Sequence, residues 1–150
     1  MKNKTSAWLI IVVLGWMGMM YYFSNQPGLL ALPYLEKFNL IPHFANEHLN
    51  DDLELVVRKL AHVAEYAVLY VLIYLASRRV LFPAGERSLP KALLCALFFC
   101  LTFAASDEIH QLYVKGRDGR IIDVFIDLFG VMLGQMTVLI GILLKQTHHL

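Results

Sequence analysis

The sequence is short of charge and of cysteine, and each shortage excludes a class of protein. Charged residues make up 17% of its 150 residues, whereas a soluble domain has about a quarter, and 58% are hydrophobic. The formal net charge of +1 leaves no basic stripe that could neutralise a phosphate backbone, so no nucleic-acid partner is expected. Cys95 and Cys100 lie inside one apolar run and do not indicate a disulfide framework. The composition favours one small integral membrane protein.

Long apolar runs are what the sequence has in abundance, and they predict membrane-spanning helices. The first run, from Ala7 to Phe23, is near the lower length limit of a span, and no convincing signal-peptide cleavage site follows it. A segment containing Pro33 and Pro42 comes next and suits a loop on the membrane surface. We expect one domain over residues 1–150, an all-α integral membrane four-helix bundle with helices at about 6–23, 51–79, 89–113 and 120–145.

A polar cluster follows the third apolar run. This run, Ala92 to Ala105, is shorter than the roughly 20 residues that a span needs, so the third helix must continue through Asp107 and Glu108. Both carboxylates then lie at or just inside the hydrocarbon boundary. Polar groups at that depth are costly and need partners, so they indicate a functional site by default.

Helical spacing places candidate partners for these carboxylates on shared helix faces. On the second helix, Lys59, His62 and Glu65 recur every three residues. On the third helix, Gln111 lies one turn after both carboxylates. The fourth helix carries one stripe at i, i+4, i+7 and i+11, formed by Asp123, Asp127, Gly130 and Gly134. The glycines of this stripe favour close helix approach, which turns its carboxylates toward the bundle.

We expect these helices to form an outward-facing polar pocket whose residues have two kinds of role. The candidate catalytic residues are His62, Glu65, Asp107, Glu108 and Asp123. The candidate substrate-binding residues are Lys59, Tyr66, Gln111, Arg117, Arg120 and Asp127. In this hypothesis His62 and Glu65 are an acid–base pair, and the lysine and arginines grip an anionic group.

Three other interpretations of the polar residues stay open. They could merely satisfy one another and hold the bundle together. His62-x-x-Glu65 and Asp107-x-x-His110 could supply metal ligands, but the motif is unspecific and no cysteine joins it, so we predict no metal and identify no cofactor. Proton-coupled transport would need a polar path through the other half of the bundle, and none is evident in the sequence.

The placement of lysine and arginine gives a weak preference for one orientation in the membrane. With four spans, both termini and the loop at residues 78–91 share one side, where basic residues are slightly more frequent. We therefore predict a multi-pass protein of the cell membrane with both termini cytoplasmic. The polar pocket then lies on the extracytoplasmic side.

Several spaced motifs occur in order along the chain. They are Ser24-x-Gln26-Pro27, Lys59 with His62 and Glu65-Tyr66, Asp107-Glu108-x-x-Gln111, and Arg117 followed by Asp123 and Gly130. In these motifs, over the stretch from about Phe23 to Gly134, the chain resembles the VanZ-like family, which is named for a protein associated with teicoplanin resistance. One departure is Asp127, because members of that family commonly carry asparagine there.

The resemblance implies a small bacterial envelope membrane protein with this four-helix plan, and it does not supply a reaction. We expect the lipid bilayer as one partner. The pocket is expected to bind or act on a cell-envelope component, such as a lipid-linked glycan, an anionic lipid or a glycopeptide. The alternative is a binding or antibiotic-resistance factor that engages such a ligand without chemistry, so whether the protein is an enzyme stays open.

Overall fold

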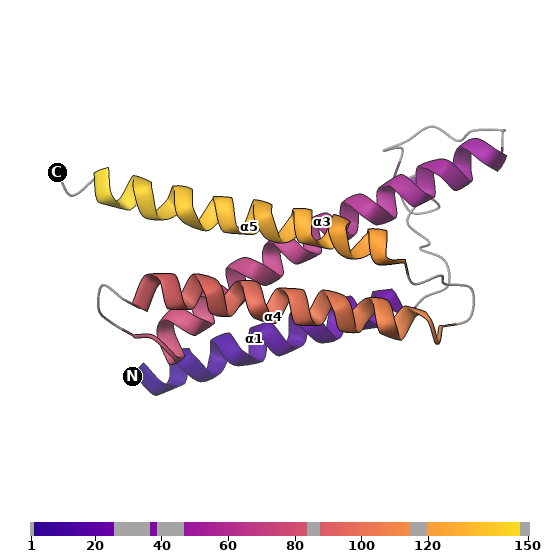
Figure 1. Ribbon diagram of the computed structural model, residues 1–150. Coiled ribbons are helices and arrows are strands. Elements are labelled where there is room, and N and C mark those ends of the chain that lie inside the picture. Colours follow the sequence, from indigo (N-terminus) through magenta and orange to yellow (C-terminus); the bar gives the residue numbers. More distant parts are fainter. Residues whose placement is uncertain (1, 26–36, 39–46, 84–87, 115–119, 148–150) are drawn as a thin grey trace.

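The computed structural model describes residues 2–25, 37–38, 47–83, 88–114 and 120–147. Within these ranges the chain forms four long helices and no strand (Figure 1). The helices are α1 (Lys2–Ser24), α3 (Glu47–Val80), α4 (Ser88–Gln111) and α5 (Ile121–Thr147). Each contains a segment that is long and apolar enough to cross a membrane. The expected all-α, four-span membrane fold is therefore confirmed.

The helix bounds differ from the predicted ones mainly at α3. This helix begins at Glu47, before the predicted start near residue 51, because nothing after Pro42 breaks a helix and acidic residues near a helix N-terminus are favourable. α4 ends at Gln111, slightly before residue 113, and α5 extends to Thr147. Most of the expected surface loop, residues 26–36 and 39–46, lies outside the described ranges.

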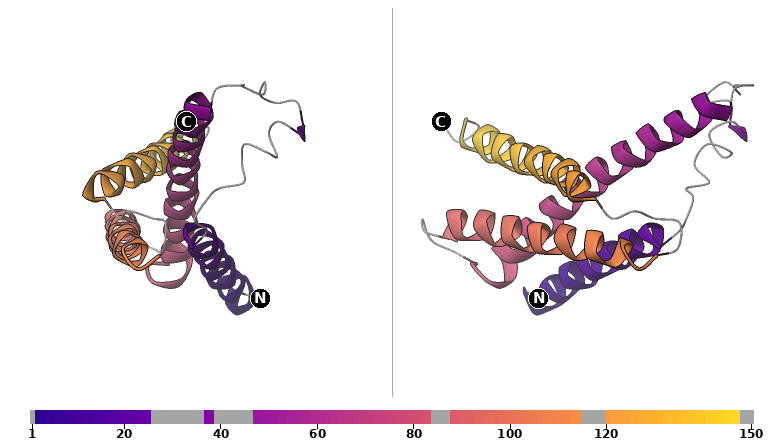
Figure 2. Two further views of the ribbon diagram at one scale, coloured as in Figure 1. Left: turned by 90° about the vertical axis from the view of Figure 1, so that its right-hand side faces the viewer. Right: turned by 45° about the vertical axis from the view of Figure 1, so that its right-hand side comes forward.

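α3 is the central helix of the bundle. It packs against α1, α4 and α5, whereas α1 makes only slight contact with α4. Figure 2 shows α3 between α1 on one side and α4 and α5 on the other. Its buried apolar side chains form much of the core, and they are Tyr66, Leu69, Tyr70, Ile73 and Tyr74. The position of α3 means that any site built on it can draw on residues from α4 and α5 together.

α4 packs on α3 through a stripe of small residues. Its buried residues recur about every four positions, and they are Ser88, Ala92, Ala96, Cys100, Ala104, Asp107, Glu108 and Gln111. Tyrosines of α3 fill the space opposite: the Tyr66 ring lies 6.2 Å from the Phe103 ring, and the Tyr70 hydroxyl donates to the Leu93 carbonyl at 3.3 Å. Asp107 and Glu108 lie on the same face of α4 as the small residues, so both carboxylates are buried in the bundle.

Glycines of α5 set the distance between α5 and α3. A Cβ atom at Gly130 would overlap the backbone carbonyl oxygen of Val63, and one at Gly134 would overlap that of Ala67. Only glycine fits such a backbone-to-backbone contact, so the predicted close approach at this stripe is confirmed. Asp127 lies one turn earlier on the same buried face of α5.

The bundle has two distinct ends. Both termini lie at one end, which is the left of Figure 1, and the N-terminal half of α3 projects from the other. The end of α4 and the start of α5 also lie at this second end. The predicted polar residues are therefore gathered away from the termini.

Candidate functional site

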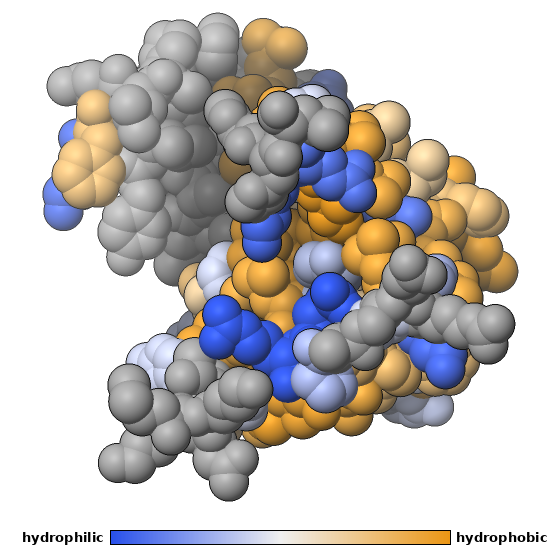
Figure 3. Space-filling view, turned by 90° about the vertical axis from the view of Figure 1, so that its left-hand side faces the viewer, coloured by the Kyte–Doolittle hydropathy of each residue, from blue (hydrophilic) through white to orange (hydrophobic). Residues whose placement is uncertain are grey.

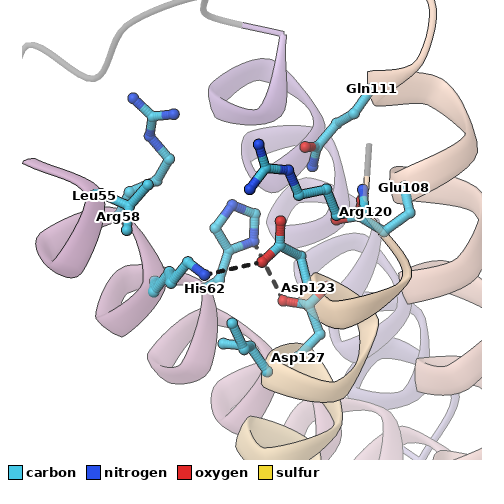
Figure 4. Close-up of a pocket in the computed structure, with 10 residues that line it drawn as sticks. Leu55, Arg58, His62, Glu108, Gln111, Arg120, Asp123 and Asp127 are labelled. Carbon is cyan, nitrogen blue, oxygen red and sulfur yellow. Dashed lines mark hydrogen bonds and ion pairs between the residues drawn. The ribbon is translucent and has the colours of Figure 1, made fainter. Parts of the chain in front are cut away.

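A cavity of about 180 Å³ opens at the end of the bundle opposite the termini, where α3, α4 and α5 meet. Figure 4 shows its lining side chains. They come from one face of α3, the last turn of α4 and the first turns of α5, and they are Leu55, Arg58, Lys59, His62, Glu108, Gln111, Arg120, Asp123, Ile126 and Asp127. The cavity is therefore polar although it is enclosed by helices of apolar composition.

The floor of the cavity is formed by His62 and Asp127. Asp127 is only 1% exposed, and the His62 side chain is 16% exposed. His62 Nδ1 lies 3.4 Å from Asp127 Oδ1, which is within ion-pair distance, but the two atoms lack hydrogen-bond geometry. Among the described residues, neither His62 Nδ1 nor Asp127 Oδ2 has a hydrogen-bond partner. Buried polar atoms are rarely left unpaired, so this floor has capacity for a further polar group.

The rim of the cavity carries the cationic side chains. Lys59 Nζ lies 3.2 Å from Asp123 Oδ1, and Arg58 Nη2 lies 3.2 Å from Glu54 Oε1. These side chains are between 24% and 38% exposed, and pairs with this exposure contribute only about 0–1 kcal/mol each. In Figure 4, Arg120 lies between Gln111 and Asp123. Such weak rim pairs can exchange their partners for an anionic ligand at little cost.

The last turn of α4 contributes two buried polar side chains with mainly structural contacts. Glu108 Oε2 accepts a hydrogen bond of 2.8 Å from the backbone N–H of Arg120, which fastens the start of α5 to α4. A carboxylate is also favourable there because a helix N-terminus carries partial positive charge. Gln111 Nε2 donates to Asp107 Oδ2 at 3.0 Å. The Glu108 contact agrees with the interpretation that some of the polar residues hold the helices together, whereas the Gln111 contact lies within α4.

The structure brings most of the predicted site residues to the cavity, but not all of them. The cavity is lined by Lys59, His62, Glu108, Gln111, Arg120, Asp123 and Asp127. Glu65, Tyr66 and Asp107 do not line it. Arg117 lies outside the described residues.

The three described residues that miss the cavity have other surroundings. Trp16 of α1 donates to the backbone carbonyl of Glu65 at 3.1 Å, so this part of α3 faces α1. Tyr66 is fully buried in the core, and Asp107 is buried against Gln111. The cavity that His62 lines therefore does not include Glu65, and Asp127 lies beside His62 there; the acid–base pairing of His62 with Glu65 stays a prediction.

Sequence reasoning missed Arg58, Leu55 and Ile126, which also line the cavity. On α3 the lining positions 55, 58, 59 and 62 follow the i, i+3, i+4, i+7 pattern of one helix face. That wider pattern could have found Arg58, whereas the spacing of three from Lys59 to Glu65 passed over it. The pattern of positions 55, 58, 59 and 62 on one face of the helix is therefore the sequence signal that could have indicated Arg58.

His110, the second histidine considered as a metal ligand, does not line the cavity that contains His62. The His110 ring lies 4.5 Å from the Tyr21 ring, which places it against α1. In the part of the chain that the structure describes, no three His, Cys, Asp or Glu side chains are gathered as a metal site requires. The arrangement is instead one of cations at the rim and carboxylates and an imidazole at the floor.

Comparison with known proteins adds one finding to this geometry. A family model described as VanZ/LLP1 matches residues 9–144. This stretch includes all the residues that line the cavity. No curated protein and no solved structure matches the chain.

Proposed function

The chain belongs to the VanZ/LLP1 family and is a multi-pass membrane protein, and from this we propose that its polar cavity binds the head group of a cell-envelope component. The chemistry of the lining suggests two features of that ligand. An anionic group, such as a phosphate, suits the rim formed by Arg58, Lys59 and Arg120. A hydroxyl or amine suits the floor formed by His62 and Asp127. Lipid-linked glycans and anionic phospholipids share this combination.

The observation that carries the proposal is that two buried polar atoms at the floor, His62 Nδ1 and Asp127 Oδ2, have no hydrogen bond among the described residues, although His62 Nδ1 lies at ion-pair distance from Asp127 Oδ1. Leaving a buried polar group unsatisfied costs about 1–3 kcal/mol. Packing of the bundle does not require buried polar groups with this cost, because the small residues of α4 and α5 already bring the helices together. A ligand that fills the cavity would offset it.

The proposal gives different weights to the predicted site residues. His62, Asp127 and the rim cations contact the ligand, and the first two are the groups that could exchange a proton with it. Glu108, Gln111 and Asp107 act as supports, since Glu108 bonds to the backbone at the start of α5 and Gln111 bonds to Asp107 within α4. Glu65 has no ligand contact in this proposal because it does not line the cavity.

We also propose that both termini are cytoplasmic and that the cavity opens on the extracytoplasmic side. Support comes from the basic residues at the terminal end of the bundle, which include Arg78, Arg79, Lys91 and Lys145. Ligands of the outer leaflet, including a glycopeptide such as teicoplanin, would then reach the cavity directly.

The proposal is tested by substitutions at Asp127 that separate binding from folding. Asp127→Leu replaces an incompletely paired buried carboxylate with an apolar side chain of similar size, so the melting temperature should hold or rise. Asp127→Asn keeps a hydrogen-bonding group, so it should retain binding within a few-fold. Thr137→Val serves as the control, because its hydroxyl bonds only to its own helix at Leu133 among the described residues.

The measurement is binding of undecaprenyl phosphate, phosphatidylglycerol and teicoplanin to the full chain in nanodiscs, beside its melting temperature. At least one probe should bind wild type and the Asn variant and lose tenfold or more in affinity with Asp127→Leu. If Asp127→Leu is folded and binds every probe as wild type does, the site hypothesis fails and the structural interpretation stands.

A further inference from the structure

A second cavity lies at the other end of the bundle, where both termini are. Its volume is about 580 Å³, and it lies between the last turns of α3, the start of α4 and the end of α5. The lining residues are Tyr74, Leu75, Arg78, Arg79, Leu89, Ile142, Lys145 and Gln146. Figure 3 looks onto this end and shows hydrophilic residues near its middle with hydrophobic residues around them.

The cavity is a consequence of where the glycines lie on α5. Gly130 and Gly134 bring α5 against the backbone of α3 in the half of the helix nearer its start. Beyond that crossing the two helices diverge toward the termini, as Figures 1 and 2 show. Ile142 and Lys145 then face a space that no helix of the described chain fills.

The charged side chains that line this cavity, among the residues that the structure describes, are all positive. Arg78, Arg79 and Lys145 come from two different helices, and none of the described carboxylates lines the cavity. Among the described residues, none of the three has an ion-pair partner. A concentration of like charge at this place disfavours the fold unless an anion neutralises it.

Hydrogen bonds also hold the Arg78 side chain in one position. A residue that served only to supply positive charge would not need them. Arg78 Nη1 donates to the carbonyl of Phe82 at 3.2 Å and to the hydroxyl of Ser88 at the start of α4. The guanidinium is therefore fixed between α3 and α4 beside the cavity. A positioned guanidinium is well suited to bind a phosphate, because its N–H donors match the geometry of phosphate oxygens.

The depth of the cavity matches the level of lipid head groups. The axial distance from Ile121 to Lys145 is about 36 Å at 1.5 Å per residue, which exceeds a hydrocarbon core of about 30 Å. Lys145 therefore reaches the interface when the start of α5 is at the opposite boundary. The apolar side chains of Leu75, Leu89 and Ile142 line the same cavity and suit an acyl chain.

We propose that this second cavity binds an anionic phospholipid, with its phosphate at Arg78, Arg79 and Lys145 and an acyl chain between α3 and α5. Basic pockets between membrane helices are a recognised way of binding such head groups. This site is independent of the function proposed for the first cavity, since the two share no residue. The bound lipid would fill the space that the divergence of α5 leaves.

The experiment counts lipids that remain bound to the full chain in native mass spectra, with phosphatidylglycerol and phosphatidylcholine as probes. Wild type should retain phosphatidylglycerol at least tenfold better than phosphatidylcholine. Arg79→Gln and Lys145→Gln should each reduce that retention about fivefold. Both change exposed side chains, so folding is expected to survive.

Lys91→Gln is the matched control, because Lys91 is an exposed residue of α4 at the same end and does not line the cavity. It removes the same charge and should leave lipid retention unchanged. If Lys91→Gln weakens retention as much as Lys145→Gln does, the effect is one of general surface charge and the proposal is wrong. It is also wrong if inorganic phosphate at equal concentration displaces the lipid, since the cavity would then be a phosphate site.

Discussion

Replacing Gly130 with alanine is expected to separate α5 from α3 and to destabilise the protein. The added Cβ would overlap the backbone carbonyl oxygen of Val63. A backbone atom in the middle of a helix cannot rotate away as the end of a flexible side chain can. The two helices must therefore move apart along the contact that holds the first cavity together.

The size of the effect follows from two opposing contributions. Alanine has a higher helix propensity than glycine by about 1 kcal/mol in water, which favours the variant. Overpacking of a filled contact costs about 1–3 kcal/mol, and an overlap with backbone belongs at the upper end of that range. The net loss in the free energy of unfolding is therefore about 2 kcal/mol, or a factor of about 30 in the folding equilibrium.

Gly141→Ala is the matched control on the same helix. A Cβ at Gly141 meets no other atom within 4 Å, so this variant gains helix propensity without overlap. Both variants and wild type are unfolded by SDS titration in mixed micelles, and near-ultraviolet circular dichroism of the core tyrosines follows the transition. Gly130→Ala should unfold earlier than wild type, and Gly141→Ala should match or exceed wild type.

The same variant should also weaken ligand binding at the first cavity. Asp127 lies one turn before Gly130, so moving α5 away from α3 lengthens the separation between Asp127 and His62. Equal stability of Gly130→Ala and Gly141→Ala would refute the reasoning, because it would mean that α3 and α5 do not meet through backbone at this residue.

Three further predictions concern topology, the rim and the core. A cysteine at the exposed Tyr113, in a background lacking Cys95 and Cys100, should react with an impermeant thiol reagent in intact cells; reaction only after permeabilisation would put the first cavity on the cytoplasmic side. Lys59→Met should lower the free energy of unfolding by less than about 1 kcal/mol in the same SDS titration, because its ion pair is partly exposed; a loss of several kcal/mol would contradict this. Ala96→Leu should cost about 1–3 kcal/mol by overpacking a fully buried position, whereas Leu at the exposed Ala105 should cost little; similar melting temperatures would argue against the small-residue contact of α4 with α3.

The sequence by itself determined the helices and the inward face of α5. Runs of apolar residues long enough to span a membrane depend on composition alone, so four helices could be predicted without knowing how they pack. The stripe of Asp127, Gly130 and Gly134 could be found because residues three and four apart share a helix face whatever surrounds it. Its glycines also predicted the close contact with α3.

Tertiary structure decided which polar residues meet. His62 and Glu65 are three residues apart on one helix, yet His62 lines the first cavity beside Asp127 and Glu65 does not line it. Arg58 entered the lining although the predicted face passed over it. Helix periodicity gives the angle between two side chains on one helix, but not how that helix is rotated toward its neighbours.

The rotation and offset of each helix depend on all of its contacts at once. α3 touches three helices, so its orientation is fixed jointly by the Trp16 contact, the small residues of α4 and the glycines of α5. The divergence of α5 beyond Gly134, which creates the second cavity, likewise depends on a crossing between two helices. The spacing of residues within one helix does not determine such contacts. Each contact depends on how two helix surfaces that are distant along the chain fit together.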